Sequence, residues 1–418
     1  MLHRRDFLAC TAGLLWPASL PQQRDGSPKR IAFVGTAVTN LSHSQHFLDR
    51  LTLGYTWQGR WQAPRVQVAA VYIDQFPDGD LARGRIARHQ LRQAHSVSEA
   101  LTLGGSKLAV DGVVIIGEHG RYPRNEKGQT LYPRYRWFKE VVKVFEESGQ
   151  AVPVFNDKHL STSWNECTEM VADSKRLGFP FLSGSSLPVT WRLPALDMPY
   201  DAELSESVCV AYGRVDSYDF HAFETAQCMS ERRRGGEVGI RRALAARGEE
   251  LWSILAANDR RVTRDLFLAA LNRSHNLPVE TSYPSDQVTF EWARQILPDT
   301  LGFFFEHRDG FRTSAFLTAI RDFNYAGYLS DQKTILSCQM YLPMPDRGST
   351  TADFFNPLVR YIEDMVITGQ VPYPVERTLL TSGMVIAGVE SLHRGEEVQT
   401  PEMEVRYRGP RESKFRQV

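Results

Sequence analysis

Asp111-Gly112-Val113-Val114-Ile115-Ile116-Gly117 is the stretch that decides the fold of the first half of this 418-residue chain. Four β-branched residues in succession favour an extended strand, and glycines on either side favour breaks in it. Because no polar side chain alternates with the apolar ones, both faces of the strand are expected to be buried. Such a strand is typical of a parallel sheet that carries helices on both faces.

Similar apolar runs lie on both sides of this strand, and helical periodicity separates them. Further strands are expected at residues 30–35, 66–74, 152–155 and 179–184. Helices are expected at 44–53, 97–103, 135–148 and 166–177, and an inserted loop at 54–64. Strands that alternate with helices predict a doubly wound, Rossmann-type domain, which we place at residues 30–187.

The pattern changes near Trp191, where stretches of period-two alternation begin. Strands are expected at 207–213, 302–306, 311–317 and 333–340, with helices at 217–233 and 264–272. These predict an α+β domain with a largely antiparallel open sheet at residues 188–345. Two late helices, 354–367 and 375–392, belong to a C-terminal part, 346–418, that is expected to pack back on the first domain. The run Glu231-Arg232-Arg233-Arg234 is interpreted as a solvated helix end.

The N-terminus has the pattern of a twin-arginine export signal. Arg4 and Arg5 precede an apolar stretch from Phe7 to Leu20. That stretch is shorter than the ~20 residues of a membrane span, and no other segment suggests a stable span. We therefore expect residues 1–29 to be signal and linker, the twin-arginine export machinery to be a partner, and the mature protein to be periplasmic.

The composition excludes one broad class of partner. Lysine plus arginine balance aspartate plus glutamate at 49 each, so the charge does not favour nucleic acid. The five cysteines show no zinc-site spacing, and the sequence leaves their disulfide status open. They are Cys10, Cys167, Cys209, Cys228 and Cys338. A homo-oligomer is left open as well.

The stretch Val154-Phe155-Asn156-Asp157-Lys158-His159-Leu160-Ser161 carries the main chemical expectation. It places an acid and a lysine just beyond the C-terminal end of a strand, where open α/β sheets bind their ligands. A lysine in that position can serve as an acid or a base. The alternative interpretation is a solvated Asp157–Lys158 pair in a surface loop.

The order of the segments resembles the glucose-fructose oxidoreductase / inositol dehydrogenase (Gfo/Idh/MocA) family over most of the mature chain. Asp157 and Lys158 stand where that family has its Glu-Lys-Pro motif, and His159 replaces the proline. The resemblance implies an oxidoreductase that acts on a sugar or polyol with NAD or NADP. It also implies that Lys158, Asp157 and, on a second-domain helix, His221 are the catalytic residues.

The phosphate-binding loop departs from the family. Dinucleotide sites use Gly-x-Gly-x-x-Gly so that the backbone can approach the pyrophosphate, whereas Gly35-Thr36-Ala37-Val38-Thr39-Asn40 keeps only the first glycine. Val38 stands near the point of close approach, so weak cofactor binding is expected. Asp74, which ends a strand, is expected either to bind a ribose hydroxyl or to cap a turn. The candidate cofactor-binding residues are Gly35, Thr36, Val38, Asp74 and Glu118.

A polar insertion after residue 117 leaves a second reading open. Glu118 and His119 are expected at the ligand edge of the sheet, near His43, His46, Asp157 and His159. Imidazoles and carboxylates together can bind a divalent metal, with His119 and His159 as weak candidates. Because no ligand spacing is present, the alternative is that these polar groups hydrogen-bond a sugar or a loop backbone. The second reading predicts a cofactor-free or metal-dependent sugar lyase or hydrolase on the same scaffold. A non-catalytic sugar-binding protein is the third possibility.

Overall fold

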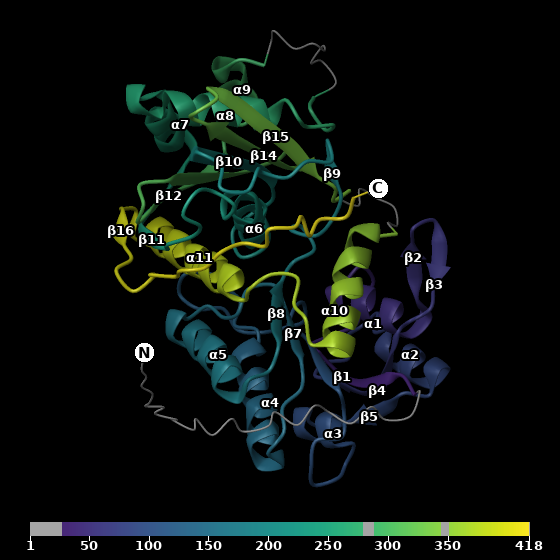
Figure 1. Cartoon of the computed structure of the whole chain (residues 1–418). Helices are drawn as coiled ribbons and strands as arrows, with labels where there is room; N and C mark the ends of the chain where they lie inside the picture. The colour runs from purple at the N-terminus through teal and green to yellow at the C-terminus, as the bar shows by residue number, and fades with distance from the viewer. Residues whose placement is uncertain (1–26, 279–287, 344–350, 418) are drawn as a thin grey trace, which may run out of the picture.

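Six parallel strands form the sheet of the first half of the chain (Figure 1). The computed structural model describes residues 27–278, 288–343 and 351–417, so most of the expected export segment lies outside the described residues. In space the strands are ordered β5 (Arg92–Ala94), β4 (Val66–Ile73), β1 (Lys29–Gly35), β6 (Gly112–Ile116), β7 (Val154–Asp157) and β8 (Phe181–Gly184). β1, the first strand in sequence, lies in the middle of this sheet. The strands β4 and β5 extend the sheet on one side of β1, and β6, β7 and β8 extend it on the other, so the predicted doubly wound topology is confirmed. Val113 to Ile116 are fully buried at its centre, as expected of an uninterrupted apolar strand.

Helices cover both faces of the parallel sheet. One side carries α3 (Val97–Thr102), α4 (Arg134–Ser148) and α5 (Trp164–Leu177), which pack side by side. The other side carries α1 (His43–Leu53), which packs on β4, and beyond it α2 (Ala82–His89). The inserted loop expected at 54–64 is instead a hairpin of β2 (Tyr55–Trp57) and β3 (Arg60–Gln62).

The second sheet is antiparallel except for the parallel pair β10–β13. Its order is β16 (Val398–Gln399), β11 (Ile240–Arg247), β12 (Leu301–His307), β13 (Arg312–Thr318), β10 (Leu204–Tyr212), β14 (Phe323–Leu329), β15 (Thr334–Met340) and β9 (Arg192–Leu193). The predicted fold class is therefore confirmed. β11 and β14 were not expected from sequence: β11 reads IRRALAAR, whose alanines and arginines favour a helix, and cross-strand pairing overrides that preference.

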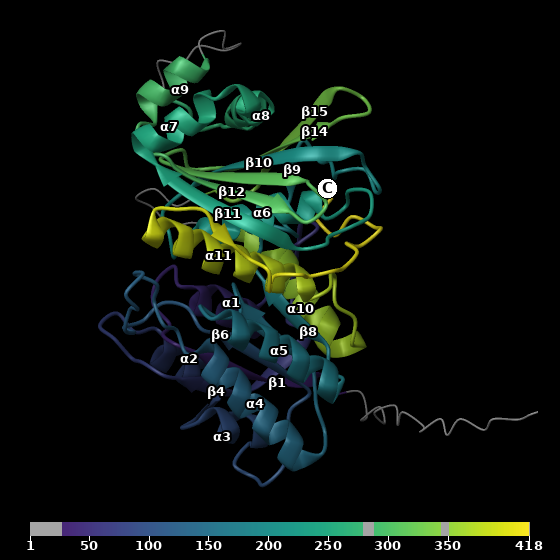
Figure 2. The same cartoon turned by 90° about the vertical axis from the view of Figure 1, so that its left-hand side faces the viewer.

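Helices cover the two faces of the second sheet in different ways. The outer face packs against α7 (Gly248–Ala256), α8 (Arg261–Leu271) and α9 (Phe290–Ile296), around a hydrophobic core of its own. The inner face packs against α6 (Asp219–Ser230) and α11 (Glu376–Arg394). Figure 2 shows α11 between the two sheets, where it also contacts α5. Both late helices were expected to pack back on the first domain. α10 (Asn356–Thr368) does so, against α1 and β4, whereas α11 contacts both halves.

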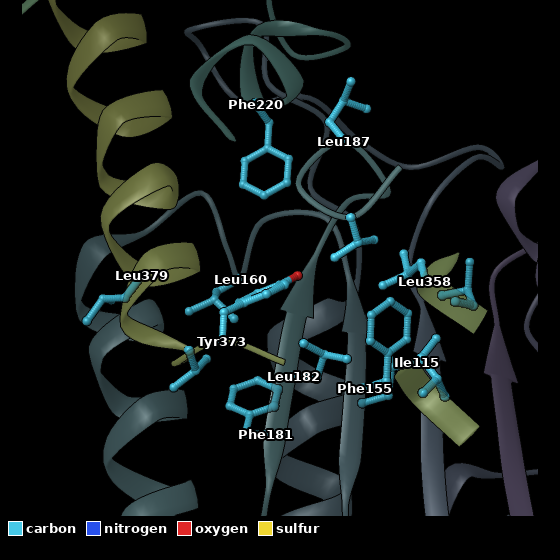
Figure 3. Close-up of a cluster of buried hydrophobic side chains, with 14 of the residues drawn as sticks. Ile115, Phe155, Leu160, Phe181, Leu182, Leu187, Phe220, Leu358, Tyr373 and Leu379 are labelled. Carbon is cyan, nitrogen blue, oxygen red and sulfur yellow. The ribbon is translucent and has the colours of Figure 1, made fainter. Parts of the chain in front are cut away.

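Apolar side chains from both halves meet near the carboxyl ends of the parallel strands (Figure 3). Phe155 of β7 and Leu182 of β8 lie there with Leu358 of α10, Leu379 of α11 and Phe220 of α6. This shared core fixes the second-half helices relative to the first sheet. The polar residues at the same strand ends are therefore held in one arrangement.

The charged run after α6 is not a solvated helix end. Glu231, Arg232 and Arg233 are buried, and Glu231 forms an ion pair with Arg377 of α11. Arg233 pairs with Glu237 through two nitrogens, at 2.9 and 3.2 Å. The interpretation from sequence was wrong for these three residues, because each meets a partner from a distant or following segment, and paired charges tolerate burial. Arg234, the last residue of the run, is exposed as expected.

Candidate active site

Glu118, which follows β6, lies between two cations at the carboxyl edge of the parallel sheet. Its Oε1 accepts a hydrogen bond from Nζ of Lys158 at 3.0 Å, and its Oε2 accepts one from Arg134 at 2.6 Å. Arg134 also donates to Nε2 of His159 at 3.0 Å. Burial by itself would raise the pKa of Glu118, but the charges of Lys158 and Arg134 outweigh it and hold that pKa well below its ordinary value. Glu118 is therefore an anion that fixes both cations.

Gly117 allows this arrangement. A Cβ at residue 117 would lie 2.5 Å from Cγ of Arg134, so a larger residue would displace the arginine. The arginine begins α4, and its side chain reaches back across the end of β6 to Glu118.

Lys158 is held in an uncommon backbone conformation. Its φ of +64° lies in the left-handed region, which costs a non-glycine residue free energy and persists where the surroundings enforce it. Its backbone N–H donates to the carbonyl of Gly184 at 3.1 Å, and the N–H of Leu160 donates to Ser382 of α11 at 3.0 Å. Lys158 itself is buried, so the surface-loop alternative for the Asp157–Lys158 pair is wrong.

Asp157 faces a different partner from its neighbour Lys158. Oδ2 of Asp157 lies 2.7 Å from Nδ1 of His43, the first residue of α1. The carboxylate is fully buried, and its Oδ1 has no hydrogen-bond partner among the described residues. Because β6 lies between β1 and β7 in the sheet, this pair joins the helix that follows β1 to a strand two positions away.

Two further imidazoles lie next to His43. The ring centroid of His119 is 5.6 Å from that of His43, and the centroid of His221, on α6, is 6.4 Å away. Burial lowers the pKa of His119 to about 4, against the opposing charge of Glu118. Burial and the charge of Lys158 hold the pKa of His221 well below its ordinary value. Both rings are therefore neutral near pH 7, and each can donate one hydrogen bond and accept another.

We call seven residues at this edge the imidazole–lysine cluster, and Arg134 of α4 joins two of them, Glu118 and His159. The seven are His43, Glu118, His119, Asp157, Lys158, His159 and His221. The three residues expected to be catalytic, Asp157, Lys158 and His221, all belong to it. Four buried polar atoms in the cluster have no partner among the described residues: Asp157 Oδ1, His119 Nε2, His159 Nδ1 and His221 Nδ1. Buried polar groups are nearly always hydrogen-bonded, so these atoms point to water or a polar ligand at this place.

The residues expected at the phosphate-binding loop are buried. Thr36 and Val38 have no exposed surface, and the hydroxyl of Thr36 donates to the carbonyl of Glu118. A Cβ at Gly35 would lie 3.0 Å from Phe33 and 3.1 Å from Oγ of Ser44, so glycine is needed here for packing. The loop thus lies under the insertion that begins at Glu118.

Several amides at the start of α1 already have partners from the chain. Oγ of Ser42 accepts from the N–H groups of Thr39 and Gln45 at 3.1 and 3.2 Å, and Oε1 of Gln45 accepts from Leu41 at 2.6 Å. The N–H groups of His43 and Ser44, in the first turn of the helix, have no such partner within the described ranges. They are the groups left for an anion at this helix end.

Asp74 lies just past the end of β4, and its carboxylate accepts two phenolic hydrogen bonds. Tyr72 donates to Oδ1 at 2.8 Å and Tyr122, from the insertion, donates to Oδ2 at 2.7 Å. Neither sequence expectation, a ribose ligand or a turn cap, describes these contacts. Both carboxylate oxygens of Asp74 therefore already accept a hydrogen bond from the chain.

The metal alternative gains no support from the structure. Among the described residues, no group of three or more His, Cys, Asp and Glu side chains could hold a metal ion. His159 is a poor metal ligand because its Nε2 faces the guanidinium of Arg134. The cysteines in the described ranges, Cys167, Cys209, Cys228 and Cys338, are buried and free. No helix in those ranges is long and apolar enough to cross a membrane.

Sequence reasoning missed Arg134 and Tyr122, and it treated His43 only as a possible metal ligand beside His46. Arg134 sits at the predicted start of a helix, where no local pattern shows that its side chain turns back toward the sheet. The available signal was the insertion itself: a polar segment that contains Glu118, His119 and Tyr122 directly follows a central strand, where ligands bind.

Comparisons with known proteins identify the fold. A scan against family models and a search of curated proteins found no match. Among solved structures, GenD2 from gentamicin A biosynthesis, in complex with NAD, has a TM-score of 0.53 at 13% identity, over 91% of this chain and 99% of that one. Myo-inositol dehydrogenase from Lactobacillus casei, in complex with NAD(H) and myo-inositol, has a TM-score of 0.54 at 10% identity, over 90% of this chain and 97% of that one. The chain therefore has the fold of the inositol dehydrogenases, as its resemblance to the Gfo/Idh/MocA family implies.

Proposed function

We propose that the protein is an oxidoreductase that interconverts a hydroxyl and a carbonyl group of a sugar or polyol with NAD or NADP. The observation that carries this proposal is the imidazole–lysine cluster at the carboxyl edge of the parallel sheet, where folds of this type bind their ligands. Its lysine, imidazoles and carboxylates supply both donors and acceptors for hydroxyl groups. The likeness to structures that hold NAD, in one case with myo-inositol, supports the same assignment.

The chain offers anchors for a dinucleotide, although some carry other bonds. The N–H groups of His43 and Ser44 lie at the positive end of α1, and Ser44 Oγ is buried with no hydrogen-bond partner among the described residues. These groups suit a pyrophosphate, and Asp74 suits a ribose once Tyr122 releases it. The residues therefore fit the cofactor, but binding it requires Asp74 to give up its hydrogen bond from Tyr122. Weak binding is therefore expected.

Hydride transfer is the chemistry that NAD or NADP supplies when bound. The residues of the chain bind the substrate and move its proton. Lys158, held in place by Glu118, stabilises negative charge on the reacting oxygen. His221, on a helix of the second sheet, offers a neutral imidazole from the opposite side and orients a second hydroxyl.

A cofactor-free sugar lyase or hydrolase is the second candidate. The observation in its favour is that Tyr122, Ser42 and Gln45 already bond to groups that a dinucleotide would use. The imidazole–lysine cluster holds acids and bases enough for proton transfers without hydride transfer.

One experiment separates the two candidates. The purified chain is mixed with NAD or NADP and a set of polyols and sugars that includes myo-inositol, and reduced nicotinamide is followed by absorbance. Reduction that depends on the polyol and fails in Lys158→Met supports the oxidoreductase. Failure of both cofactors to bind by calorimetry, together with sugar cleavage detected by mass spectrometry, would replace it with the second candidate.

We further propose that the protein is exported to the periplasm by the twin-arginine pathway. Arg4 and Arg5 ahead of an apolar stretch support this. Replacing both with lysine is expected to keep the protein in the cytoplasm, as measured by cell fractionation. Equal periplasmic recovery of the variant and the parent would refute export by this route.

A further inference from the structure

We propose that His43, oriented by Asp157, is the general base that removes the proton from the reacting hydroxyl, and the general acid in the reverse direction. The inference deepens the proposed function and rests on a polyol binding at the imidazole–lysine cluster. It does not depend on which cofactor, if any, takes part.

The Asp157–His43 pair has the geometry of a base with a fixed tautomer. The fully buried carboxylate lies 2.7 Å from Nδ1 of His43, which places the ring hydrogen on that nitrogen. Nε2 then carries the free lone pair, and no described residue forms a hydrogen bond with it. In acid–base histidines generally, the carboxylate also stabilises the imidazolium once the proton arrives.

His43 and His119 are the partly exposed members of the cluster, and His119 keeps its Nε2 buried. The side chain of His43 keeps 15% of its surface exposed, whereas Asp157 keeps none. Lys158, His159 and His221 are buried. His43 is therefore the partly exposed imidazole whose orienting carboxylate is fully buried.

Lys158 is not free to take the proton, because Glu118 holds its ammonium group. The groups that face His43 come from several elements: Asp157 at the end of β7 and Lys158 after it, Glu118 and His119 after β6, His221 from α6, and His46 from α1. Among them, only His43 combines an orienting carboxylate with a free ring nitrogen and exposure.

Unpartnered atoms beside His43 give an independent reason to place a hydroxylated substrate there. Asp157 Oδ1, His119 Nε2 and His221 Nδ1 are buried and have no hydrogen-bond partner in the part of the chain that the structure describes. The ring centroids of His119 and His221 lie 5.6 and 6.4 Å from that of His43. Vicinal hydroxyl groups donate and accept hydrogen bonds and so satisfy such atoms. In the step itself the O–H bond breaks, its electron pair stays on oxygen, and the proton moves to Nε2.

Histidine carbethoxylation tests the proposal without relying on turnover. Diethyl pyrocarbonate is added to the full chain with and without myo-inositol, scyllo-inositol or glucose, and each histidine is followed by peptide mass spectrometry. We expect His43 to react about tenfold faster than His119, His159 and His221, and one of the polyols to slow it several-fold. The exposed His95 serves as the internal control, since no polyol is expected to protect it.

Turnover with NAD or NADP gives the second measurement. His43→Gln is expected to lose about 100-fold in kcat while His95→Gln keeps full activity. Free imidazole is expected to restore part of the activity of His43→Ala, which a merely structural role would not allow. Wild-type kcat in His43→Gln, or no protection of His43 by any polyol, would overturn the inference. If wild type reduces no cofactor but a polyol still protects His43, the oxidoreductase fails and the assignment of His43 stands.

Discussion

Glu118 accepts a hydrogen bond from Lys158 at 3.0 Å although the two residues are 40 positions apart in the chain. The parallel sheet brings them together, because Glu118 follows β6 and Lys158 follows β7, its neighbour. With Arg134 on its other oxygen, Glu118 holds the lysine side chain in place. The pair is therefore both a structural contact and the electrostatic centre of the proposed site.

Replacing Lys158 with methionine is expected to lower kcat by about 100-fold with little loss of stability. Arg134 still neutralises Glu118 in the variant, so the free energy of unfolding should fall by less than the ~3–5 kcal/mol typical of a stripped buried charge. Steady-state kinetics and urea unfolding measure the two effects. The matched control is Lys139→Met, which removes a surface lysine paired with Glu169 and Asp173. Equal activity of the two variants would remove Lys158 from the mechanism.

The fold was predictable because its signals are local. The apolar run from Val113 to Ile116 predicts a strand that is buried on both faces. Helical periodicity between such strands predicts that helices connect them in a parallel sheet. β11 was not predicted because its alanines and arginines favour a helix, whereas in the structure this segment pairs with β12 as a strand. The burial of Arg233 was not predicted because its partners come from elsewhere in the chain: Glu237 from the next turn and Asp309 from a distant loop.

The site was predictable only as far as the strand ends. Asp157 and Lys158 follow a strand directly, so the sheet edge could be inferred for them. The partners could not be inferred, because His43 reaches Asp157 from 114 residues away and Tyr122 reaches Asp74 from an insertion. Long-range pairing of this kind leaves no periodic trace in the sequence.

Tyr122→Phe is expected to strengthen the binding of NAD or NADP several-fold. The substitution removes the phenol that donates to Asp74 and so frees one carboxylate oxygen for a ribose hydroxyl. Calorimetric titration of both cofactors measures the change. Tyr135→Phe, which loses a hydrogen bond to the surface residue Glu169, is the control and should bind like wild type. Weaker binding in Tyr122→Phe would show that Tyr122 supports the cofactor site.

His46→Gln is expected to make the free energy of unfolding fall less with decreasing pH than it does in wild type. Burial lowers the pKa of His46 to about 3, with a further contribution from Arg50. Between about pH 6.5 and that value the unfolded chain binds a proton that the folded chain does not, so wild type loses stability as the pH falls. Without the imidazole, the variant should lose less over this interval, by on the order of 2 kcal/mol. Urea unfolding across the interval measures the difference, and parallel profiles for variant and wild type would contradict it.

Arg377→Met is expected to destabilise the protein by about 3–5 kcal/mol, because it leaves Glu231 buried without its guanidinium. Arg377 donates through two nitrogens to Glu231, and this ion pair joins α11 to the end of α6. The double variant Arg377→Met with Glu231→Gln should recover much of the loss, since no unpaired charge remains. Chemical unfolding of both variants checks this, and a single variant as stable as wild type would show that the pair contributes nothing.

Glu224→Gln is expected to stabilise the protein at neutral and alkaline pH. Glu224 is fully buried on α6, and burial raises its pKa to about 7 against the hydrogen bond from Ser185. The unfolded carboxyl ionises near its ordinary value of 4.5, so between that value and about 7 the unfolded state releases a proton that the folded state keeps. Wild-type stability must then fall as the pH rises through this interval. Above it the cost is on the order of 3 kcal/mol.

The glutamine variant carries no charge at any pH and still accepts the hydrogen bond from the Ser185 N–H, which lies 2.6 Å from Oε2 of Glu224 in wild type. It should therefore match wild type near pH 4.5 and exceed it by a few kcal/mol near pH 8. Urea unfolding of both proteins across this range gives the two profiles. Glu169→Gln, an exposed carboxyl, is the control and should not gain stability as the pH rises. A gain for Glu224→Gln that is the same at both ends of the range would mean that the glutamine packs better and that no buried charge is relieved.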